Sequence, residues 1–330
     1  VLSGAERLKS LLFYYFSNEY EDSFDEGLHV IEGDITNFED FEKLIPEKID
    51  TVINCAANVK HFSSGTDIED INLGGVVNGL KFAKLKNAKY VQVSTYSIAG
   101  ESIDNYPPVD VKFTERDLFI GQAVNNQYLS SKFLAERAVL EAAVNDDLDV
   151  KIMRVGNLMA RSSDSEFQIN FESNGFINRL KAFVTIGQMP YSMMMNNVEF
   201  SPIDTTAKAI VELSKTPKAC TVFHPYDYHS ISFGDIIDII KPLGLKINLV
   251  EDKDYENALD DALADKTKQD GVSGLITSIG SGKVKKIWLP VDNTYTVQAL
   301  YRLGVKWPFI SEEYVYNFIK FLDDLDFFSV

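Results

Sequence analysis

The sequence predicts an α/β fold in which helices cover a doubly wound parallel sheet. In the first half of the chain, short and nearly continuous apolar runs alternate with longer segments of helical periodicity. Strands that are apolar on both faces are typical of parallel sheets buried between helices. After about residue 158 the alternation loosens, which predicts a smaller, mainly helical C-terminal domain.

The expected strands of the first half are short and end in small or polar residues. They span residues 28–34, 50–57, 90–94 and 150–155, and helices are expected from the N-terminus through Phe16 and at 38–44, 66–86 and 127–143. The 66–86 helix is expected because Ile68, Ile71, Val76 and Leu80 recur at helical spacing. Ligands of such sheets lie at the carboxyl ends of the strands, so a site is expected in the turns that follow them.

The second half is expected to be mostly helical. Helices are expected at residues 176–184, 204–215, 233–240, 255–265 and 312–325, a strand at 221–224, and irregular segments at 161–174 and at the glycine-rich run 271–282. We expect a first domain at 1–158, incomplete at its N-terminus, and a substrate-binding domain at 159–330. Part of 197–232 is expected to return to the first domain.

Composition excludes several classes of function. A formal net charge of −17 over 330 residues argues against nucleic-acid or anionic-membrane partners, and no apolar run is long enough to cross a bilayer. The four histidines form no zinc-type cluster and the two cysteines lack metal-ligand spacing, so no metal site is expected. Cys55 is expected to be a buried, reduced thiol in a strand, which fits a cytoplasmic setting.

Two lysine clusters interrupt this acidic background. One contains Lys81, Lys84, Lys86 and Lys89, and the other contains Lys283, Lys285 and Lys286. A solvated surface explains both, and a landing site for an acidic protein is the alternative.

The most informative segment contains Tyr128 and Lys132. A tyrosine and a lysine four residues apart project from one face of a helix. A nearby cation makes a phenol more acidic, and a hydroxyl from the end of the preceding strand could steady the same proton. Thr95 is the candidate for that hydroxyl, and Ser94 is its rival. A surface tyrosine with a solvated lysine is the structural alternative.

A glycine-rich phosphate loop is absent from the sequence. Doubly wound dinucleotide-binding folds normally open with such a loop between a strand and a helix, but no GxGxxG or GxxGxxG occurs here. The run at 271–282 does not open a helix after a strand. We expect the loop to lie before Val1, outside this numbering.

With these residues in place, the chain resembles the extended short-chain dehydrogenase/reductase superfamily, which has a Rossmann-like fold. It is most similar to the thioester reductase (terminal R) domains of nonribosomal peptide synthetases and carboxylic acid reductases. The matching segments follow the family's order at residues 32–35, 54–61, 71–75, 93–95, 128–136, 154–158 and 199–204. The Asn-Cys-Ala-Ala and Arg-Val-Gly-Asn sequences within them favour the thioester branch.

The resemblance implies an NADPH-dependent reductase. Its substrate would be an acyl or peptidyl thioester on the phosphopantetheine arm of a carrier protein, released as an aldehyde or further as an alcohol. The resemblance makes Tyr128 the general acid, Lys132 a ligand of the nicotinamide ribose, and Thr95 a second donor to the carbonyl oxygen. It assigns cofactor binding to Asp34, Ile35, Ala56, Ala57, Asn58, Asn72, Lys132, Val155 and Asn157. Asp34 could instead cap the following helix.

Three alternatives remain open at this point. A fatty acyl-CoA reductase or an NAD-dependent sugar-nucleotide epimerase or dehydratase would share most of these motifs. A non-catalytic, nucleotide-sensing protein of the same fold is the alternative from another class. Such proteins usually lack the tyrosine or the lysine, and both occur here.

Overall fold

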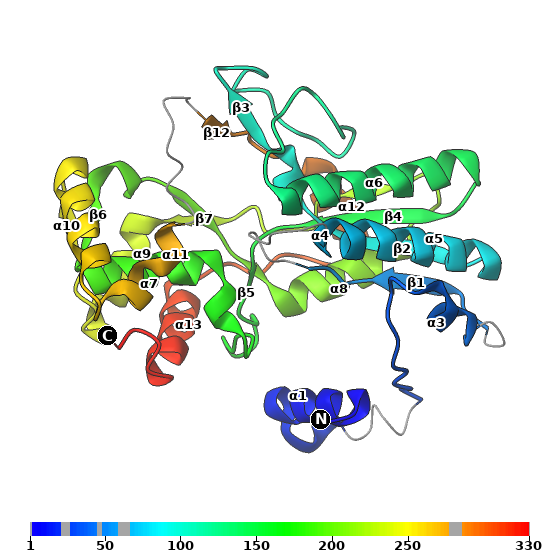
Figure 1. Ribbon diagram of the computed structural model, residues 1–330, viewed down its shortest axis with the longest axis horizontal. Coiled ribbons are helices and arrows are strands. Elements are labelled where there is room, and N and C mark those ends of the chain that lie inside the picture. The colour runs from blue at the N-terminus through cyan, green and yellow to red at the C-terminus, as the bar shows by residue number, and fades with distance from the viewer. Residues whose placement is uncertain (1, 21–26, 45–47, 59–66, 277–285, 330) are drawn as a thin grey trace. The chain divides into compact units, whose positions relative to one another are not determined.

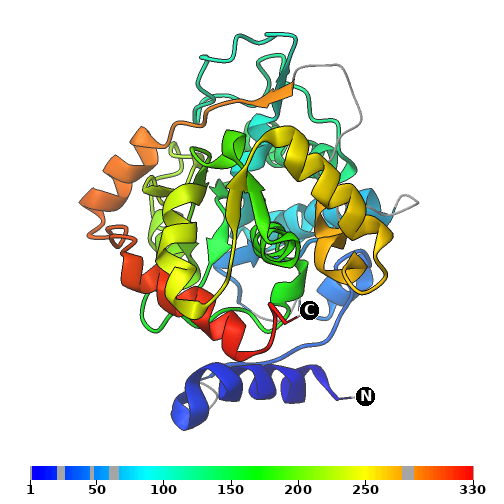
Figure 2. The same cartoon turned by 90° about the vertical axis from the view of Figure 1, so that its left-hand side faces the viewer.

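The computed structural model of the chain describes residues 2–20, 27–44, 48–58, 67–276 and 286–329 (Figures 1 and 2). The chain divides into two compact units. Unit 1 contains Val1–Ser94 and Val124–Ile152, and unit 2 contains Thr95–Ala123 and Met153–Val330. The domain boundary that the sequence suggests at residue 158 remains a prediction.

A four-stranded sheet has the order β1-β2-β4-β9. Its strands are β1 (Thr51–Asn54), β2 (Lys89–Thr95), β4 (Val150–Val155) and β9 (Val222–Phe223). β1 and β2 are parallel, with Thr51 opposite Lys89 and Asn54 opposite Gln92. All six residues of β4 are buried, as expected for an interior strand of a parallel sheet. The predicted α/β class with a parallel sheet is confirmed.

Among its described residues, unit 1 contains five helices, and a side chain caps the first turn of three of them. The five helices are α1 (Gly4–Phe16), α3 (Phe38–Glu42), α4 (Asp67–Glu69), α5 (Gly75–Lys86) and α6 (Gln127–Asn145), with a 3₁₀ turn η1 (Ser17–Tyr20) and a π-helical turn η2 (Asp70–Gly74). Ser3 and Glu6 form a capping box at α1, and Asn126 caps α6 by accepting a hydrogen bond from the Leu129 amide at 2.8 Å.

Unit 2 contains short paired strands and most of the helices. The strand pairs are β3 (Glu101–Ile103) with β12 (Lys286–Trp288), β5 (Leu158–Met159) with β8 (Ser201–Pro202), β6 (Gln188–Pro190) with β11 (Asn248–Val250), and β7 (Asn197–Glu199) with β10 (Ser230–Ser232). The helices are α7 (Gly175–Ile186), α8 (Ile203–Ser214), α9 (Phe233–Ile240), α10 (Asp252–Ala264), α11 (Gln269–Ile276), α12 (Thr294–Arg302) and α13 (Glu312–Asp324). Four 3₁₀ turns complete it: η3 (Tyr96–Ala99), η4 (Phe171–Ser173), η5 (Tyr191–Met193) and η6 (Lys241–Leu243).

The core of unit 2 is rich in aromatic rings. Phe183, Phe200, Phe233 and Phe318 are each at most 2% exposed and belong to one cluster under α7, α9 and α13. Their rings meet edge to face, for example Phe183 on Phe233 at 5.7 Å between centroids. This packing gives unit 2 a hydrophobic core of its own.

Two sequence expectations about the backbone were wrong. Residues 28–34 are extended but pair with no strand in the described part of the chain; the Glu32 carboxylate instead accepts a hydrogen bond from the Gly4 amide. Residues 271–276 are the end of α11, which packs on α7 with Gly271 against the Thr185 side chain. This glycine permits close contact between the two helices and does not mark a turn. Residues 277–282 lie outside the described residues.

Among the residues described, no helix has the length and apolarity that crossing a bilayer requires.

Candidate active site

The carboxyl end of β1 is fixed by its last residue. The Asn54 side-chain oxygen accepts a hydrogen bond from the Ala56 amide at 3.0 Å, and its amide group donates to Tyr90 Oη and Gln92 Oε1, both at 3.1 Å. Ala56 and Ala57 therefore leave the strand on a defined path, and their small side chains keep the backbone accessible. The structure places three predicted cofactor-binding residues, Ala56, Ala57 and Asn58, in this turn.

Asn72 ties this turn to helix α6. It is only 3% exposed and lies in the π-helical turn η2, a deviation that is frequent at functional sites. Its Oδ1 accepts from the Asn58 amide at 2.7 Å, and its Nδ2 donates to the Asn58 carbonyl at 3.1 Å and to Ser131 Oγ at 2.9 Å. Asn72 thus orders the backbone after β1, while a direct contact with a cofactor remains a prediction.

Tyr128 and Lys132 lie one turn apart at the start of α6, as predicted. Lys132 Nζ is 5.9 Å from the centroid of the Tyr128 ring and donates to the Val93 carbonyl in β2 at 3.2 Å. Lys132 is 6% exposed, so the alternative of a solvated surface lysine does not apply. The Ser131 hydroxyl donates to the Tyr128 carbonyl at 2.7 Å and joins this turn to Asn72.

Burial controls the protonation of both groups. It lowers the pKa of Lys132 to about 8, although the nearby Glu136 and Cys55 act in the opposite direction. Burial also raises the pKa of Tyr128 to about 12, which is opposite to the effect expected from the ammonium alone. At neutral pH the phenol is protonated and the ammonium carries its charge, which is the state a general acid requires.

The two candidate hydroxyls at the end of β2 have different partners. Ser94 is 3% exposed and donates to Glu136 Oε1 at 2.5 Å, so it is engaged in the interior of unit 1. Thr95 is the last residue of β2, and its hydroxyl oxygen accepts from the Ser97 amide at 3.2 Å, which caps η3. This bond leaves the Thr95 O–H able to donate. Thr95 belongs to unit 2, and its convergence with Tyr128 and Lys132 remains a prediction.

The expectation of a buried Cys55 was wrong. β1 ends at Asn54, and the residues along β1 are alternately exposed and half-buried, so Cys55 leaves the sheet and is exposed. Its neighbourhood still matters, because partial burial raises the pKa of the thiol while Lys132 lowers it.

Asp34 forms a local turn. Its Oδ1 accepts from the Thr36 amide at 2.8 Å and from the Thr36 hydroxyl at 2.7 Å, and these bonds lower the pKa of the carboxyl. The cap of α3 is Asn37, whose side chain accepts from the Glu39 amide at 3.2 Å. The capping alternative for Asp34 was therefore wrong, and its contact with adenine remains a prediction.

A small cavity lies beside Asp34 and Ile35. It has a volume of about 160 Å³, and its apolar wall includes Ile31, Phe41 and Leu44. Pockets that hold a whole drug-sized ligand are larger, at roughly 300–1,000 Å³. The cavity is therefore too small to hold a ligand of that size entirely.

In unit 2, Val155 ends β4 and Asn157 follows it after Gly156. The Asn157 amide donates to Glu199 Oε2 at 2.6 Å, and its side chain donates to Tyr96 Oη at 3.3 Å. The sequence interpretation assigned no role to Glu199, although it stands in a matched motif. Glu136 was also missed; its signal is the position four residues after Lys132, on the same helix face.

The lysine cluster of α5 favours a solvated surface over a landing site. Lys84 pairs with Asp146 at 2.5 Å, Lys89 with Asp149 at 3.6 Å, and Lys81 lies 3.5 Å from the centroid of the Phe38 ring. Lys283 and Lys285, like residues 59–61 of the matched motif, lie outside the described residues. Within the described ranges, no three His, Cys, Asp or Glu side chains gather as metal ligands.

Comparisons with known proteins agree with this geometry. The NAD-binding family described as male sterility protein matches residues 2–210. The thiolation-reductase di-domain of an archaeal non-ribosomal peptide synthetase is similar with a TM-score of 0.88 and 39% identity, over 99% of this chain and 68% of that chain. The reductase domain of the aureusimine biosynthetic cluster is also similar, with a TM-score of 0.80 and 26% identity, over 99% of this chain and 82% of that chain.

The terminal R domain of the myxalamid pathway shares the fold, with a TM-score of 0.74 and 19% identity over 90% of this chain and 75% of that chain. No curated protein matched the chain. The chain therefore belongs to the male sterility family of NAD-binding domains, within the extended short-chain dehydrogenase/reductase superfamily, and is an NAD(P)H-dependent oxidoreductase.

Proposed function

We propose that this protein reduces an acyl or peptidyl thioester, carried on the phosphopantetheine arm of a carrier protein, to an aldehyde with NADPH. The observation that carries the proposal is the pair of Tyr128 and Lys132, one helical turn apart, with the buried ammonium held at the end of β2. The archaeal relative supports the substrate class, because a thiolation domain and a reductase domain occur together in it.

The described residues fit a nicotinamide dinucleotide at two places. The cavity beside Asp34 and Ile35 offers apolar walls and a carboxylate, which suit an adenine ring. Lys132 donates one N–H to Val93, so the ammonium retains two for ribose hydroxyls. When bound, the cofactor supplies the hydride. The preference for NADPH over NADH is implied by the family resemblance, and parallel assays with the two cofactors would compare them.

The proposed role of Tyr128 is to protonate the substrate's carbonyl oxygen. Negative charge develops on that oxygen during reduction and requires donors that are already in place. The phenol is protonated at neutral pH and gives its proton to the oxygen, and the Lys132 ammonium stabilises the phenolate that remains. The Thr95 hydroxyl donates a second hydrogen bond.

Collapse of the resulting hemithioacetal releases the aldehyde. The proton on its oxygen returns to the Tyr128 phenolate while the C–S bond breaks. The thiolate of the carrier's arm leaves with the bonding electron pair and takes a proton from solvent. The net reaction therefore consumes one hydride and one proton for each aldehyde formed.

The test follows NADPH absorbance with acyl-phosphopantetheine and acyl-CoA thioesters, with NADH in parallel. Tyr128→Phe should lower the rate by about 10²–10⁴-fold, the contribution of a positioned general acid. Tyr301→Phe is the matched control, because this side chain is 67% exposed on α12, and it should retain the wild-type rate. Equal rates for Tyr128→Phe and wild type would refute the assigned acid. Turnover of acyl-CoA alone would indicate the fatty acyl-CoA alternative.

A further inference from the structure

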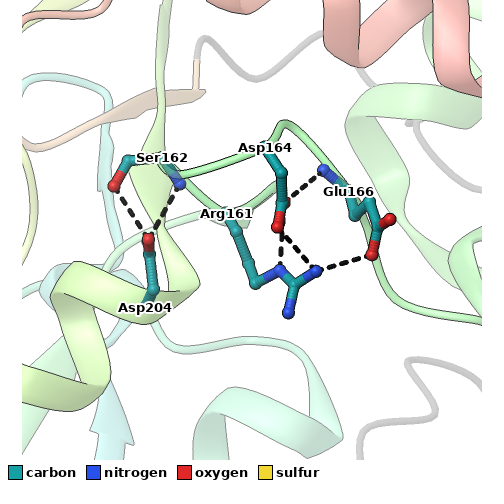
Figure 3. A network of polar contacts seen from close by, with 5 residues as sticks. All are labelled: Arg161, Ser162, Asp164, Glu166 and Asp204. Carbon is teal, nitrogen blue, oxygen red and sulfur yellow. Dashed lines mark hydrogen bonds and ion pairs between the residues drawn. The ribbon is translucent and has the colours of Figure 1, made fainter. Parts of the chain in front are cut away.

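The segment 199–204, whose sequence is Glu-Phe-Ser-Pro-Ile-Asp, holds the segment 157–162 at both ends. In the middle, β5 and β8 pair in parallel, and the Ser201 amide donates to the Asn157 carbonyl at 3.0 Å. At the far end, the Asp204 carboxylate accepts from the Ser162 amide at 3.0 and 3.1 Å and from the Ser162 hydroxyl at 2.8 Å (Figure 3). At the near end, Glu199 accepts from the Asn157 amide.

The far end continues into a loop with its own ion pairs. Figure 3 shows Arg161 between two carboxylates, with Nη2 2.7 Å from Asp164 and 2.6 Å from Glu166. These contacts are local, within five residues of the chain, and stabilise the loop after Met159. The far end therefore shapes a loop, whereas the near end lies at the turn that follows β4.

The near end is built around the Glu199 carboxyl group. Its Oε2 accepts from the Asn157 amide at 2.6 Å, and its Oε1 accepts from the Ser201 hydroxyl. A Cβ on Gly156 would lie 2.5 Å from Oε2 and 2.7 Å from Oε1. The carboxyl group thus occupies the space of a side chain at residue 156, and glycine is required there for steric reasons.

Asn157, whose backbone is held by Glu199, contacts Tyr96 through its side chain. Its side-chain amide donates to Tyr96 Oη at 3.3 Å, and the Tyr96 ring packs on Tyr226 with 5.3 Å between centroids. The Tyr226 hydroxyl donates to the Val291 carbonyl at 2.7 Å, which fixes the second ring. Tyr96 is the first residue of η3 and directly follows Thr95 in the chain.

We propose that Glu199 is a positioning residue, which fixes Asn157 and, through it, Tyr96 and the adjacent Thr95. The part of this inference that concerns Thr95 in catalysis rests on the proposed function. Glu199 touches neither substrate nor cofactor in this account; it sets the geometry of the turn after β4 and of the first turn after β2.

The electrostatic setting fits a positioning role. Burial raises the pKa of Glu199 to about 8, although the hydrogen bonds from Ser201, from the Asn157 amide and from the Asp227 amide act in the opposite direction. Burial raises the pKa values of Tyr96, Tyr226 and Tyr314, and the Glu199 charge acts in the same direction. Glutamine keeps one acceptor oxygen for the Asn157 amide, and its NH₂ group faces Ser201 in place of Oε1, so Glu199→Gln should retain the bond to Asn157.

The first test needs no cofactor. Amide hydrogen exchange, read by mass spectrometry, would compare wild type with Glu199→Ala, Glu199→Gln and the control Asp204→Ala. Glu199→Ala should accelerate exchange in peptides covering 96–100 and 156–159, and Glu199→Gln should not. Asp204→Ala should accelerate exchange around 162–166 and at Thr205, whose amide also donates to the Asp204 carboxylate, and should leave 96–100 unchanged. Unchanged exchange at 96–100 in folded Glu199→Ala would overturn the proposal.

A second variant covers the case in which Glu199→Ala does not fold. Asn157→Ala retains the backbone amide that Glu199 binds but loses the bond to Tyr96. It should accelerate exchange at 96–100 and leave 156–159 protected. Acceleration at neither segment would overturn the link from Asn157 to Tyr96.

The catalytic arm separates this inference from the proposed function. Glu199→Ala should lower kcat about 10²-fold, the cost of a misplaced group, with little change in the KM of the thioester, and Glu199→Gln should restore most of kcat. A wild-type protein that reduces no thioester would refute the proposed function, while the exchange results still decide the positioning role. An active wild type with an equally active Glu199→Ala would refute the positioning role alone.

Discussion

Two buried cations show how differently the two units use charge. In unit 1, Lys132 is 6% exposed, and burial lowers its pKa to about 8. Its ammonium has one hydrogen bond, to the Val93 carbonyl, and two further N–H groups. In unit 2, Arg154 is 1% exposed and donates to the Asp117 carbonyl at 2.8 Å, the Thr114 carbonyl at 3.4 Å and His224 Nε2 at 3.0 Å.

The difference is the one expected between the proposed reactive group, Lys132, and a structural one, Arg154. The Arg154 guanidinium lies 5.0 Å from the centroid of the Phe113 ring, and its donors connect β4 to the loop at residues 113–117. Its role is to satisfy buried acceptors. Lys132 instead has N–H groups beyond the one that binds Val93, and its pKa is lowered next to the Tyr128 phenol. Shifted pKa values of this kind cluster at functional sites.

The largest effect on stability is expected at Arg154. Arg154→Met would leave His224 Nε2 and the Thr114 and Asp117 carbonyls without their donor. Each buried acceptor left unpaired costs about 1–3 kcal/mol, so the loss of the donor to three acceptors should lower the free energy of unfolding by about 3–9 kcal/mol. Urea unfolding measures this, with Arg137→Met as the control because its ion pair with Glu141 is exposed. Equal stability of the two variants would break the comparison.

His224 should make the same region sensitive to acid. It is fully buried, its Nδ1 lies 2.7 Å from the Asp292 carbonyl, and burial together with Arg154 lowers its pKa to about 3. The unfolded chain binds this proton below about pH 6.5, so stability is complete above that pH and is lost as the pH falls toward 3.

The slope attributable to His224 is about 1.4 kcal/mol per pH unit in that window. His224→Gln carries no titrating group and retains a donor and an acceptor, so its stability should depend less on pH. Unfolding free energies at several pH values between 4 and 7 measure the difference. Parallel pH profiles for wild type and His224→Gln would show that the histidine is protonated in the folded protein.

The smallest effect on stability is expected at Lys132. Lys132→Met removes a buried charge and its desolvation cost, which offsets the lost bond to Val93 and the lost attraction to the buried Glu136. The free energy of unfolding should change by less than about 2 kcal/mol, well below the effect of Arg154→Met. A loss as large as that of Arg154→Met would assign Lys132 a structural role.

Local patterns predicted the elements that carry the site. The helix at 127–145 and the strand at 150–155 follow from their own periodicity, and the spacing of Tyr128 and Lys132 follows from the helix. What sequence patterns missed depends on contacts between distant residues. Glu199 contacts Asn157, which lies forty-two positions earlier in the chain. Cys55 follows the last residue of β1, Asn54, and is exposed like Thr51 and Ile53.

Two other errors arise from a local turn and from packing between helices. Asp34 follows a predicted strand and precedes a helix, which suits a cap, but its carboxyl group bonds to Thr36, and Asn37 takes the cap position. The glycines after Gln269 suggest a turn, yet Gly271 packs against Thr185 of another helix. Composition alone cannot distinguish a glycine that bends the chain from one that permits close packing.

We propose that the pair of Tyr128 and Lys132 beside β2 is the reactive centre. Single-turnover oxidation of NADPH by an acyl-phosphopantetheine thioester, measured with folded Lys132→Met, tests it most directly. We predict a rate at least about 10²-fold below wild type, because the phenol loses the cation that stabilises its conjugate base. A wild-type rate in folded Lys132→Met would contradict the account.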